Sequence, residues 1–523
     1  MPLRNTTLCW VLAMLSLPTY AVDNRILQNA DIEQLHTALT SGRLTSEELV
    51  RYYLDRIARF DKAGPHINAI ISLNPVVRED ARRLDTEDKT SPRRRGMLYG
   101  IPFIVKDNYD TVGVPTSGGS AALKASIPSA NAFVVQRLLE QGAVLIGKAN
   151  MSELAASYGR LGYSSAGGLT VNPYNTARDV SGSSSGSAAA VAADFAAFAL
   201  GTDTSGSLRG PASVAGLVGL RPTLGLTSRS GVIPLSLTFD TTGVIARTVK
   251  DAAIVLDVMR GPDPHDAATL AQPASHGDLM MLGSSSLQGV RLGVVTNFRG
   301  GNPEVDRIEK TALNNLEGRG AALIPITLPK QFESLWDTVL GPVGEAEFKP
   351  QFERYLQTLA SKQPKTLAQV IDASISPQVA NSSTPVNPKR LDALRQADGT
   401  LLTDSPTYIR ILTRVIPELR EQLRALVADN GLQAFVFSTM SCPASPRFDR
   451  ADPSYYCNSD DPYKASYIAS AAGFPEVTVP VGVDSANTPV GYSFMGLPHT
   501  EGQLLRLAAA LQNGLPRISP PLN

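Results

Sequence analysis

Apolar residues recur at helical spacing between residues 31 and 59. They fall on two stripes, Ile32, Leu35 and Leu39 and then Leu49, Tyr53 and Ile57. This spacing predicts helical structure across the region. Thr45 and Glu48 also stand at the spacing of a capping box, in which each side chain accepts a hydrogen bond from the other residue's backbone N–H.

Short apolar segments rich in β-branched residues predict strands between the helices. "GIPFIVKDN", residues 100–108, is expected to form a buried strand that ends near Lys106. A helix followed by a strand is predicted by "ANAFVVQRLLEQGAVLIGKAN", and again by "LNNLEGRGAALIPITL" and "LRALVADNGLQAFVFS". This succession is typical of an α/β architecture. Because no linker or repeat divides the chain, we expect one large domain, with residues 300–440 as a partly separate cap.

A serine-rich stretch, "SGSSSGSAAAVAADF" (residues 181–195), contains the pattern G-x-S-x-G. In hydrolases with a nucleophile elbow, a strand leads directly into that serine. Here the preceding segment "TVNPYNTARDV" is polar, and of the five histidines only His499 lies late enough for the usual order of a Ser-His-acid triad. A linker is also disfavoured, because residues 187–200 are strong helix formers. We therefore expect a Gly/Ser loop that leads into a buried helix.

A second polar loop lies in "LGTDTSGSLRGPASVAGLVGLRPT", residues 200–223. Gly201 and Gly206 flank a tight turn, and Ser183 and Ser207 stand on two loops that could converge. The Gly/Ser loop described above offers hydroxyls and free N–H groups at the start of a helix, and these favour negative charge. Such a site suits a phosphate, although the P-loop spacing is absent, or the charge that develops at an acyl centre.

Composition and charge narrow the function classes. The chain has 523 residues, 43% of them hydrophobic, and a formal net charge of zero. This is an ordinary globular composition, and it predicts no general electrostatic attraction to nucleic acid or to an anionic membrane. No Cys/His spacing typical of a metal site occurs, so we expect no metal.

The first residues have the pattern of an export signal. Arg4 precedes an apolar run of about ten residues, 8–17, and Thr19 and Ala21 offer small residues for cleavage. The run is too short to span a bilayer as a helix. We predict a signal peptide over residues 1–21 and a mature periplasmic or extracellular protein over 22–523, with a short buried N-terminal helix as the alternative.

Two cysteines, Cys442 and Cys457, remain once the predicted signal is removed. An oxidising compartment permits a disulfide between them, with two unrelated free thiols as the alternative.

Three long segments resemble the amidase signature family. They are residues 181–253, which begin "SGSSSGSAAAVAADFAAFALGTDTSGSLRGPASVAGLVGLRPT", the strand "GIPFIVKDN", and "AAGFPEVTVPVGVDSANTPVGYSFMG" near the C-terminus. The likeness is dense over about 95–260 and 466–512 and loose over 300–440, and it is nearest to the peptide amidases. The resemblance implies an α/β fold with a mixed central sheet covered by helices on both faces.

The resemblance also implies a catalytic arrangement. Ser207 corresponds to the nucleophile, Lys106 to the base, and Ser183 to a bridging serine that follows a cis peptide bond with Gly182. The oxyanion hole would consist of the backbone N–H groups of Thr204, Ser205, Gly206 and Ser207. Supporting positions would be Asp203, Arg209 and Ser184. Glycine is more usual in the family where this chain has Ser181, Ser185 and Ser205, which leaves the substrate specificity open.

A lysine can act as this base only when it is neutral. Its ordinary pKa of ~10.4 must fall by about three units for work near pH 7, and burial away from carboxylates supplies such a shift. Along a strand Asp107 points to the face opposite Lys106, so the local sequence permits an unpaired lysine.

The expected reaction, hydrolysis of carboxamides through an acyl-enzyme, requires no metal or organic cofactor. We expect peptide C-terminal amides as substrates and ammonia as product. One alternative is the amidotransferase subunit that makes Gln-tRNA, which is built on the same core and would work with partner subunits in the cytoplasm. Another is an inactive relative that only binds amides or peptides. Beyond a small-molecule or peptide amide we expect no nucleic-acid partner, and no membrane contact once the signal is removed. The oligomeric state stays open, and a monomer is compatible with the sequence. Tyr158 and Tyr163 lie on a loop that corresponds to one lining the substrate pocket in the family. Each of them either forms part of the pocket wall or only packs against neighbouring residues.

Overall fold

The structure is a computed structural model that describes residues 24–90, 96–271, 278–280, 282–283, 286–400 and 402–522. The predicted signal peptide, residues 1–21, lies outside the described residues. No described helix combines the length and the apolar composition that crossing a bilayer requires.

A large mixed β-sheet forms the centre of the fold. In the described residues its strands are β1 (Ile70–Leu73), β2 (Pro102–Lys106), β3 (Val144–Ala149), β6 (Phe198–Asp203), β7 (Val218–Arg221), β8 (Thr241–Ala246), β9 (Arg291–Val295), β10 (Ala322–Ile326), β11 (Ala434–Ser438), β12 (Glu476–Val483) and β13 (Pro489–Met495). Their spatial order is β1-β3-β2-β6-β8-β7-β12-β13-β11-β9-β10. A separate short hairpin pairs β4 (Tyr163–Ser164) with β5 (Gly168–Leu169).

The two halves of the sheet contain parallel strands joined through an antiparallel middle. Strand β2 runs parallel to both β3 and β6, and β9 runs parallel to both β10 and β11. The strands between them, from β6 to β13, pair antiparallel. The sequence therefore predicted the α/β class correctly, and the mixed sheet agrees with the fold that the resemblance implied.

Helices flank this sheet. They are α1 (Asn24–Leu27), α2 (Ile32–Thr40), α3 (Ser46–Phe60), α4 (Val77–Thr90), α5 (Phe133–Glu140), α6 (Ser185–Ala192), α7 (Arg209–Val214), α8 (Val249–Met259), α9 (Pro303–Gly318), α10 (Gly341–Thr358), α11 (Leu367–Ser374), α12 (Pro377–Ala380), α13 (Pro388–Asp398), α14 (Pro406–Arg410), α15 (Ile416–Asn430), α16 (Ser466–Ala472) and α17 (Glu501–Gln512). Helices α6 and α7 pack together on the central strands, and α8, α9 and α17 form a second group against the sheet. The capping box at Thr45 and Glu48 is present at the start of α3.

One element was predicted wrongly. The helix expected over residues 187–200 ends at Ala192, and Phe198–Asp203 is strand β6. Asp194 turns the chain between them with a φ of 61°, a left-handed conformation that aspartate tolerates better than most residues. Both segments are completely surrounded by protein, so alanines and phenylalanines occupy every face and no periodicity separates helix from strand.

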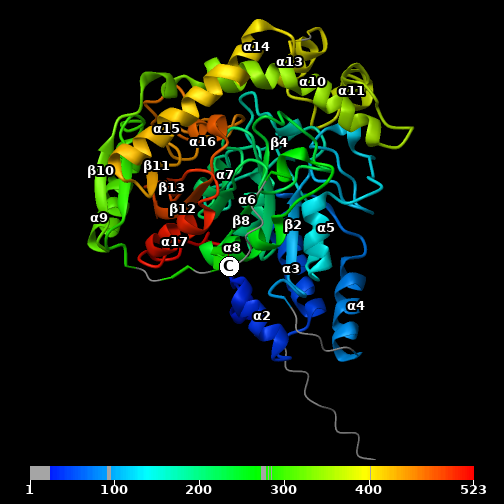
Figure 1. Cartoon of the computed structure of the whole chain (residues 1–523). Helices are drawn as coiled ribbons and strands as arrows, with labels where there is room; N and C mark the ends of the chain where they lie inside the picture. Colours follow the sequence, from blue (N-terminus) through cyan, green and yellow to red (C-terminus); the bar gives the residue numbers. More distant parts are fainter. Residues whose placement is uncertain are drawn as a thin grey trace, which may run out of the picture.

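Residues 300–440 contribute to the sheet as well as covering it. Strands β10 and β11 belong to this segment. Its helices α10, α11, α13 and α14 lie across the top of the molecule in Figure 1. There Phe348, Phe352 and Leu356 of α10 form a small hydrophobic cluster with residues of α11 and α13, distinct from the main core. The cap is thus a layer of helices resting on one end of a continuous sheet.

A disulfide bond joins Cys442 and Cys457, whose Cα atoms are 5.6 Å apart. It closes the loop between β11 and α16. The sequence alone left this pairing open.

Strands β2 and β6 are held together by two phenylalanines. Phe103 and Phe198 are completely buried, and their rings stack with centroids 5.4 Å apart. We expect Phe198→Ala to lower the free energy of unfolding by about 3–5 kcal/mol, because the strands cannot close the resulting cavity. Urea unfolding measures this loss. Val112→Ala, at a side chain that is 54% exposed, is the control and should change stability by less than about 0.5 kcal/mol. An equally small change in Phe198→Ala would contradict the packing described here.

Candidate active site

Lys106 is the last residue of β2, and its side chain is completely buried. Its Nζ donates to Ser183 Oγ at 2.8 Å and to Thr202 Oγ1 at 2.7 Å. Burial lowers its pKa to about 7, although the charges of Asp203 and Asp240 act in the opposite direction. Among the described residues no carboxylate lies within ion-pair distance of this amine. The structure thus places a desolvated, unpaired lysine where the sequence predicted one.

Asp107, the next residue, occupies the opposite face as the strand alternation predicted. Its carboxylate accepts hydrogen bonds from the backbone N–H groups of Ser117 and Gly119. It also lies 3.4 Å from the Nζ of Lys148, a second buried lysine on β3. The two lysines of neighbouring strands therefore have different surroundings, and only Lys148 has a carboxylate partner in the part of the chain that the structure describes.

Ser183 lies in the loop that leads into α6 and is 1% exposed. The peptide bond between Gly182 and Ser183 is cis, as the resemblance implied. No strand leads directly into this loop in the described residues, which agrees with the argument against a nucleophile elbow. Gly186 follows in the first turn of α6, where a Cβ atom would lie 2.4 Å from the carbonyl oxygen of Asn150, so no larger residue fits.

Ser184 joins the two serine-containing loops. Its Oγ donates to the carbonyl oxygen of Thr202 at 3.1 Å, and its backbone N–H donates to the carbonyl oxygen of Ser207 at 3.0 Å. The structure therefore brings the Ser183 loop and the Ser207 loop together, as their sequences suggested.

Ser181 is one of the serines that stand where the resemblance to the family leads us to expect glycine. Its φ is 57°, in the left-handed region that favours glycine. Its N–H donates to Asp179 at 2.8 Å, and its hydroxyl lies 2.6 Å from that of Tyr463. These bonds hold the unusual conformation and connect the loop to the segment that follows the disulfide.

Ser207 follows β6 and is 8% exposed. Gly206, just before it, has a φ of 98°, which only glycine adopts readily. The Gly206 N–H donates to Asp203 Oδ1 at 2.9 Å, so it is engaged inside the protein. By contrast, the N–H groups of Thr204, Ser205 and Ser207 have no acceptor at hydrogen-bond distance among the described residues. Of the four N–H groups expected to form an oxyanion hole, that of Gly206 is therefore already bonded, whereas these three have no acceptor in the described structure.

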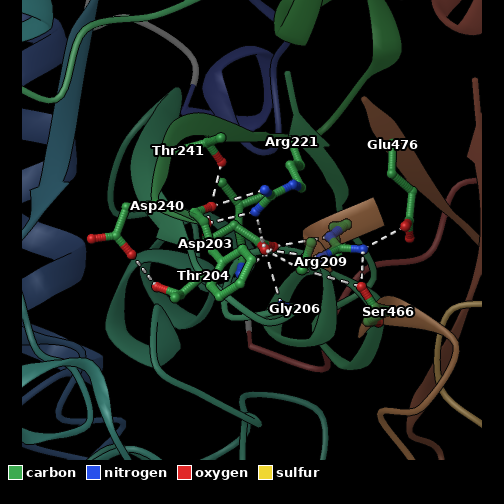
Figure 2. A network of polar contacts seen from close by, with 12 residues as sticks. Asp203, Thr204, Gly206, Arg209, Arg221, Asp240, Thr241, Ser466 and Glu476 are labelled. Atoms are coloured by element: carbon green, nitrogen blue, oxygen red, sulfur yellow. Dashed lines mark hydrogen bonds and ion pairs between the residues drawn. The ribbon is translucent and has the colours of Figure 1, made fainter. Parts of the chain in front are cut away.

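A buried ionic network anchors the loop that carries Ser207 (Figure 2). Arg209 binds both carboxylate oxygens of Asp203 at 2.9 Å, and Arg221 binds Oδ1 at 2.8 Å. Arg209 also forms an ion pair with Glu476 of β12. Burial alone would raise the pKa of Asp203, but the two guanidinium groups outweigh it and hold the pKa well below its ordinary value.

Asp203 and Arg209 were expected to brace this loop, whereas Arg221 and Glu476 were missed. The available signal was a charged residue inside an otherwise apolar strand, in "LVGLRPT" and in "FPEVTVPV". Such residues are rarely buried without a partner.

Thr204 connects the same loop to the cap through a second chain of polar contacts. Its hydroxyl donates to Asp240 Oδ1 at 2.5 Å, and the other oxygen of Asp240 accepts from the backbone N–H of Ser236 at 3.0 Å. The Ser236 hydroxyl donates to Glu347 of α10 at 2.6 Å, and Glu347 also accepts from Tyr408 of α14 at 2.9 Å. Sequence reasoning identified neither acid, because their partners are distant in the chain.

A cleft of about 480 Å³ opens over Ser207. Its walls come from two separate parts of the chain, residues 155–207 and residues 336–402, with a few additional positions. The lining includes Tyr158, Gly182, Thr204, Ser205, Ser207, Trp336, Glu345, Phe348, Arg390 and Tyr463. Tyr158 is thus part of the wall, whereas Tyr163 packs elsewhere and donates to the carbonyl oxygen of Pro385 at 2.6 Å. No histidine lines the cleft among the described residues.

Comparison with known proteins agrees with this geometry. The family model described as Amidase matches residues 48–505. The crystal structure of the peptide amidase of Stenotrophomonas maltophilia superposes with a TM-score of 0.83 at 35% identity, covering 94% of this chain and 98% of that one. An amidase family protein of Bacillus anthracis gives a TM-score of 0.83 at 30% identity over 96% and 95%. A glutamyl-tRNA(Gln) amidotransferase subunit of Nitratidesulfovibrio vulgaris is 32% identical over 95% of this chain and 99% of its own length.

The family model and these relatives cover nearly the whole described chain, and the relatives are a peptide amidase, an amidase family protein and an amidotransferase subunit. From its sequence and its fold together, this chain belongs to the amidase signature family and is an amidohydrolase.

Proposed function

We propose that this protein is an exported amidohydrolase that removes ammonia from the C-terminal carboxamide of peptides, with Ser207 as nucleophile, Ser183 as bridge and Lys106 as base. The observation that supports it most directly is the contact of 2.8 Å between a buried, unpaired Lys106 and Ser183 Oγ. A serine hydroxyl is a weak nucleophile until a base takes its proton, and a lysine with a pKa of about 7 can do so at neutral pH.

In the proposed reaction the Ser207 proton passes to Ser183 while the Ser183 proton passes to Lys106. Ser207 Oγ forms a bond to the carbonyl carbon, and the resulting oxyanion faces the N–H groups of Thr204, Ser205 and Ser207. Each such donor is worth roughly 10²–10³ in rate. The proton returns along the same path to the amide nitrogen, the carbon–nitrogen bond breaks, and ammonia leaves. Water then hydrolyses the acyl-enzyme by the same relay.

The substrate class is supported by the cleft and by the similarity to the peptide amidase. A volume of about 480 Å³ is within the range of sites that hold a drug-sized ligand. A primary amide alone would leave most of that space empty, whereas two or three residues of a peptide amide fill it. The aromatic residues Tyr158, Trp336 and Phe348 provide apolar surface for such side chains.

The sequence identity of 32% to the glutamyl-tRNA(Gln) amidotransferase subunit favours a second candidate function. In that case the protein would be a glutaminase that passes ammonia to partner subunits. The predicted signal peptide and the disulfide between Cys442 and Cys457 support the exported amidase instead, because disulfides persist in oxidising compartments. Ammonia release from free glutamine, compared with release from an N-acetylated dipeptide amide, separates the two.

We expect Ser207→Ala to lower kcat on a peptide amide by at least about 10⁴-fold, because no acyl-enzyme can form. Ammonia release measures the loss, and an unchanged melting temperature shows that the fold is retained. Ser187→Ala, at a buried serine of α6 whose hydroxyl donates to the carbonyl oxygen of Leu200 at 2.9 Å, serves as the control. Turnover by Ser207→Ala within tenfold of the wild type would refute the assignment.

On the acid side, the pH dependence of kcat/KM should reflect protonation of the Lys106 amine. Below its pKa of about 7 the amine is protonated and cannot accept the Ser183 proton. We therefore expect kcat/KM to fall about tenfold per pH unit below that value and to level off above it. Initial rates between about pH 5 and 9 test this, a range that spans the pKa on both sides. A profile that is flat across the range is incompatible with lysine as the base.

Export predicts a processed chain with no free thiol. Edman sequencing of the protein from culture medium or periplasm should begin at Val22, and thiol titration under denaturing conditions should detect none before reduction and two after it. The export proposal would be contradicted by a cytoplasmic chain that retains Met1 and has Cys442 and Cys457 as reactive thiols. That result would leave the proposed hydrolysis unaffected.

A further inference from the structure

Arg390 is a buried cation in the wall of the cleft. It lies on α13, its side chain is 3% exposed, and it borders the same cavity as Ser207. Its guanidinium carbon lies 5.5 Å from the ring centre of Tyr158 and 4.9 Å from that of Phe348. The two rings hold the planar group in place and shield it from water.

This guanidinium has few hydrogen-bond partners. Its Nε has none, although it is inaccessible to solvent. Nη2 donates to the carbonyl oxygen of Leu154 at 3.4 Å, which is a long contact. No described carboxylate is within ion-pair distance, and the nearby Glu153 is bonded to Ser165 N at 3.1 Å and Ser165 Oγ at 2.9 Å. Burial lowers the pKa of Arg390, while its interaction with the Tyr158 hydroxyl and the charge of Glu153 oppose this.

The other buried arginines of the described chain are all paired with a carboxylate. The pairs are Arg56–Asp194, Arg178–Asp452, Arg209–Asp203, Arg221–Asp203 and Arg260–Asp257. Burying a cation without a counter-charge is costly, so proteins seldom do it without a ligand to supply one. Arg390 departs from the pattern, and it does so at the cleft.

Among the described residues that line the cleft, the only other charged one is Glu345. It is exposed and forms no ion pair in the described structure. Water screens its charge, whereas the charge of Arg390 acts in a medium of lower dielectric constant. The interior of the cleft therefore favours an anion despite the acid at its rim.

We propose that Arg390 binds a carboxylate in the acyl part of the substrate, so that the preferred substrates are C-terminal amides of acidic peptides. This inference rests on the amide hydrolysis proposed above. The planar fork of a guanidinium binds a carboxylate through two parallel hydrogen bonds, and the contacts of Arg390 with the rings of Tyr158 and Phe348 restrict its orientation before the substrate arrives.

The test uses N-acetylated tripeptide amides of alanine in which one residue is aspartate or, in the matched peptide, asparagine. The acidic residue is placed at each of the three positions in turn. For the wild type we expect kcat/KM to be about ten to a hundred times higher with aspartate than with asparagine in at least one position. Equal rates with both peptides at every position would overturn the proposal.

Arg390→Gln should remove this aspartate preference, and Arg390→Lys should keep part of it because the charge remains. The quantity measured in each variant is the ratio of kcat/KM for the aspartate peptide to kcat/KM for the asparagine peptide. A general loss of activity lowers both values and leaves this ratio unchanged. Lys389→Gln removes the same charge from an exposed position on α13 and should leave the ratio unchanged. A ratio that survives in Arg390→Gln contradicts the assignment, and if that variant does not fold, Arg390→Lys and the wild-type ratio still decide.

Failure of the proposed function is distinguishable from failure of this inference. If no amide releases ammonia, the hydrolase assignment fails, and calorimetry then measures binding of the same peptide pairs. Tighter binding of the aspartate peptides would still support an anion site at Arg390, whereas equal binding would refute it.

Discussion

The chemistry proposed for this site depends on a lysine that is buried without an acid. Taking an ammonium group out of water costs several kcal/mol unless a carboxylate compensates, and here two hydroxyl groups surround the amine instead. The carboxylates of the neighbourhood are engaged elsewhere, Asp107 with Lys148 and Asp203 with Arg209 and Arg221. A single additional acid beside Lys106 would restore the ordinary basicity of the amine and with it a permanent positive charge. Much of the surrounding polar network therefore pairs the nearby carboxylates with other cations, so that they do not form ion pairs with Lys106.

The second requirement is that two loops meet, and the sheet provides it. Strands β2 and β6 lie side by side and parallel, so the residues at their ends, Lys106 and the Thr202–Ser207 turn, come to the same edge. The Ser183 loop is then joined to this edge through Ser184, which bonds Thr202 and Ser207. Behind the turn, Arg209 and Glu476 connect the end of β6 to β12 across the sheet (Figure 2). The position of the serines thus depends on bonds between segments far apart in the sequence.

A structural feature could be predicted from the sequence when it depends on residues that are close together in the chain. The Thr45 capping box, the strand before Lys106 and the face occupied by Asp107 depend on neighbouring residues, and all three were predicted correctly. The boundary between α6 and β6 was not, because a segment buried on every side has no periodicity. Arg221, Glu476, Asp240 and Glu347 act through partners 18 to 267 residues away, so only the folded chain identifies them. Family resemblance, rather than residue pattern, supplied the pairing of Ser183 with Lys106.

The division of the cleft wall between two chain segments has a consequence for divergence. The groups to which we assign the reaction belong to residues 106–207, whereas Trp336, Phe348 and Arg390 belong to a separate segment of the chain. Substitutions in the helical layer can thus accumulate, changing which acyl groups are accepted, while the hydrolytic apparatus stays intact. In a scaffold of this kind, substrate specificity can change through substitutions in one wall of the cleft. The border between the two chain segments is also a position at which segments can be exchanged by recombination in the laboratory.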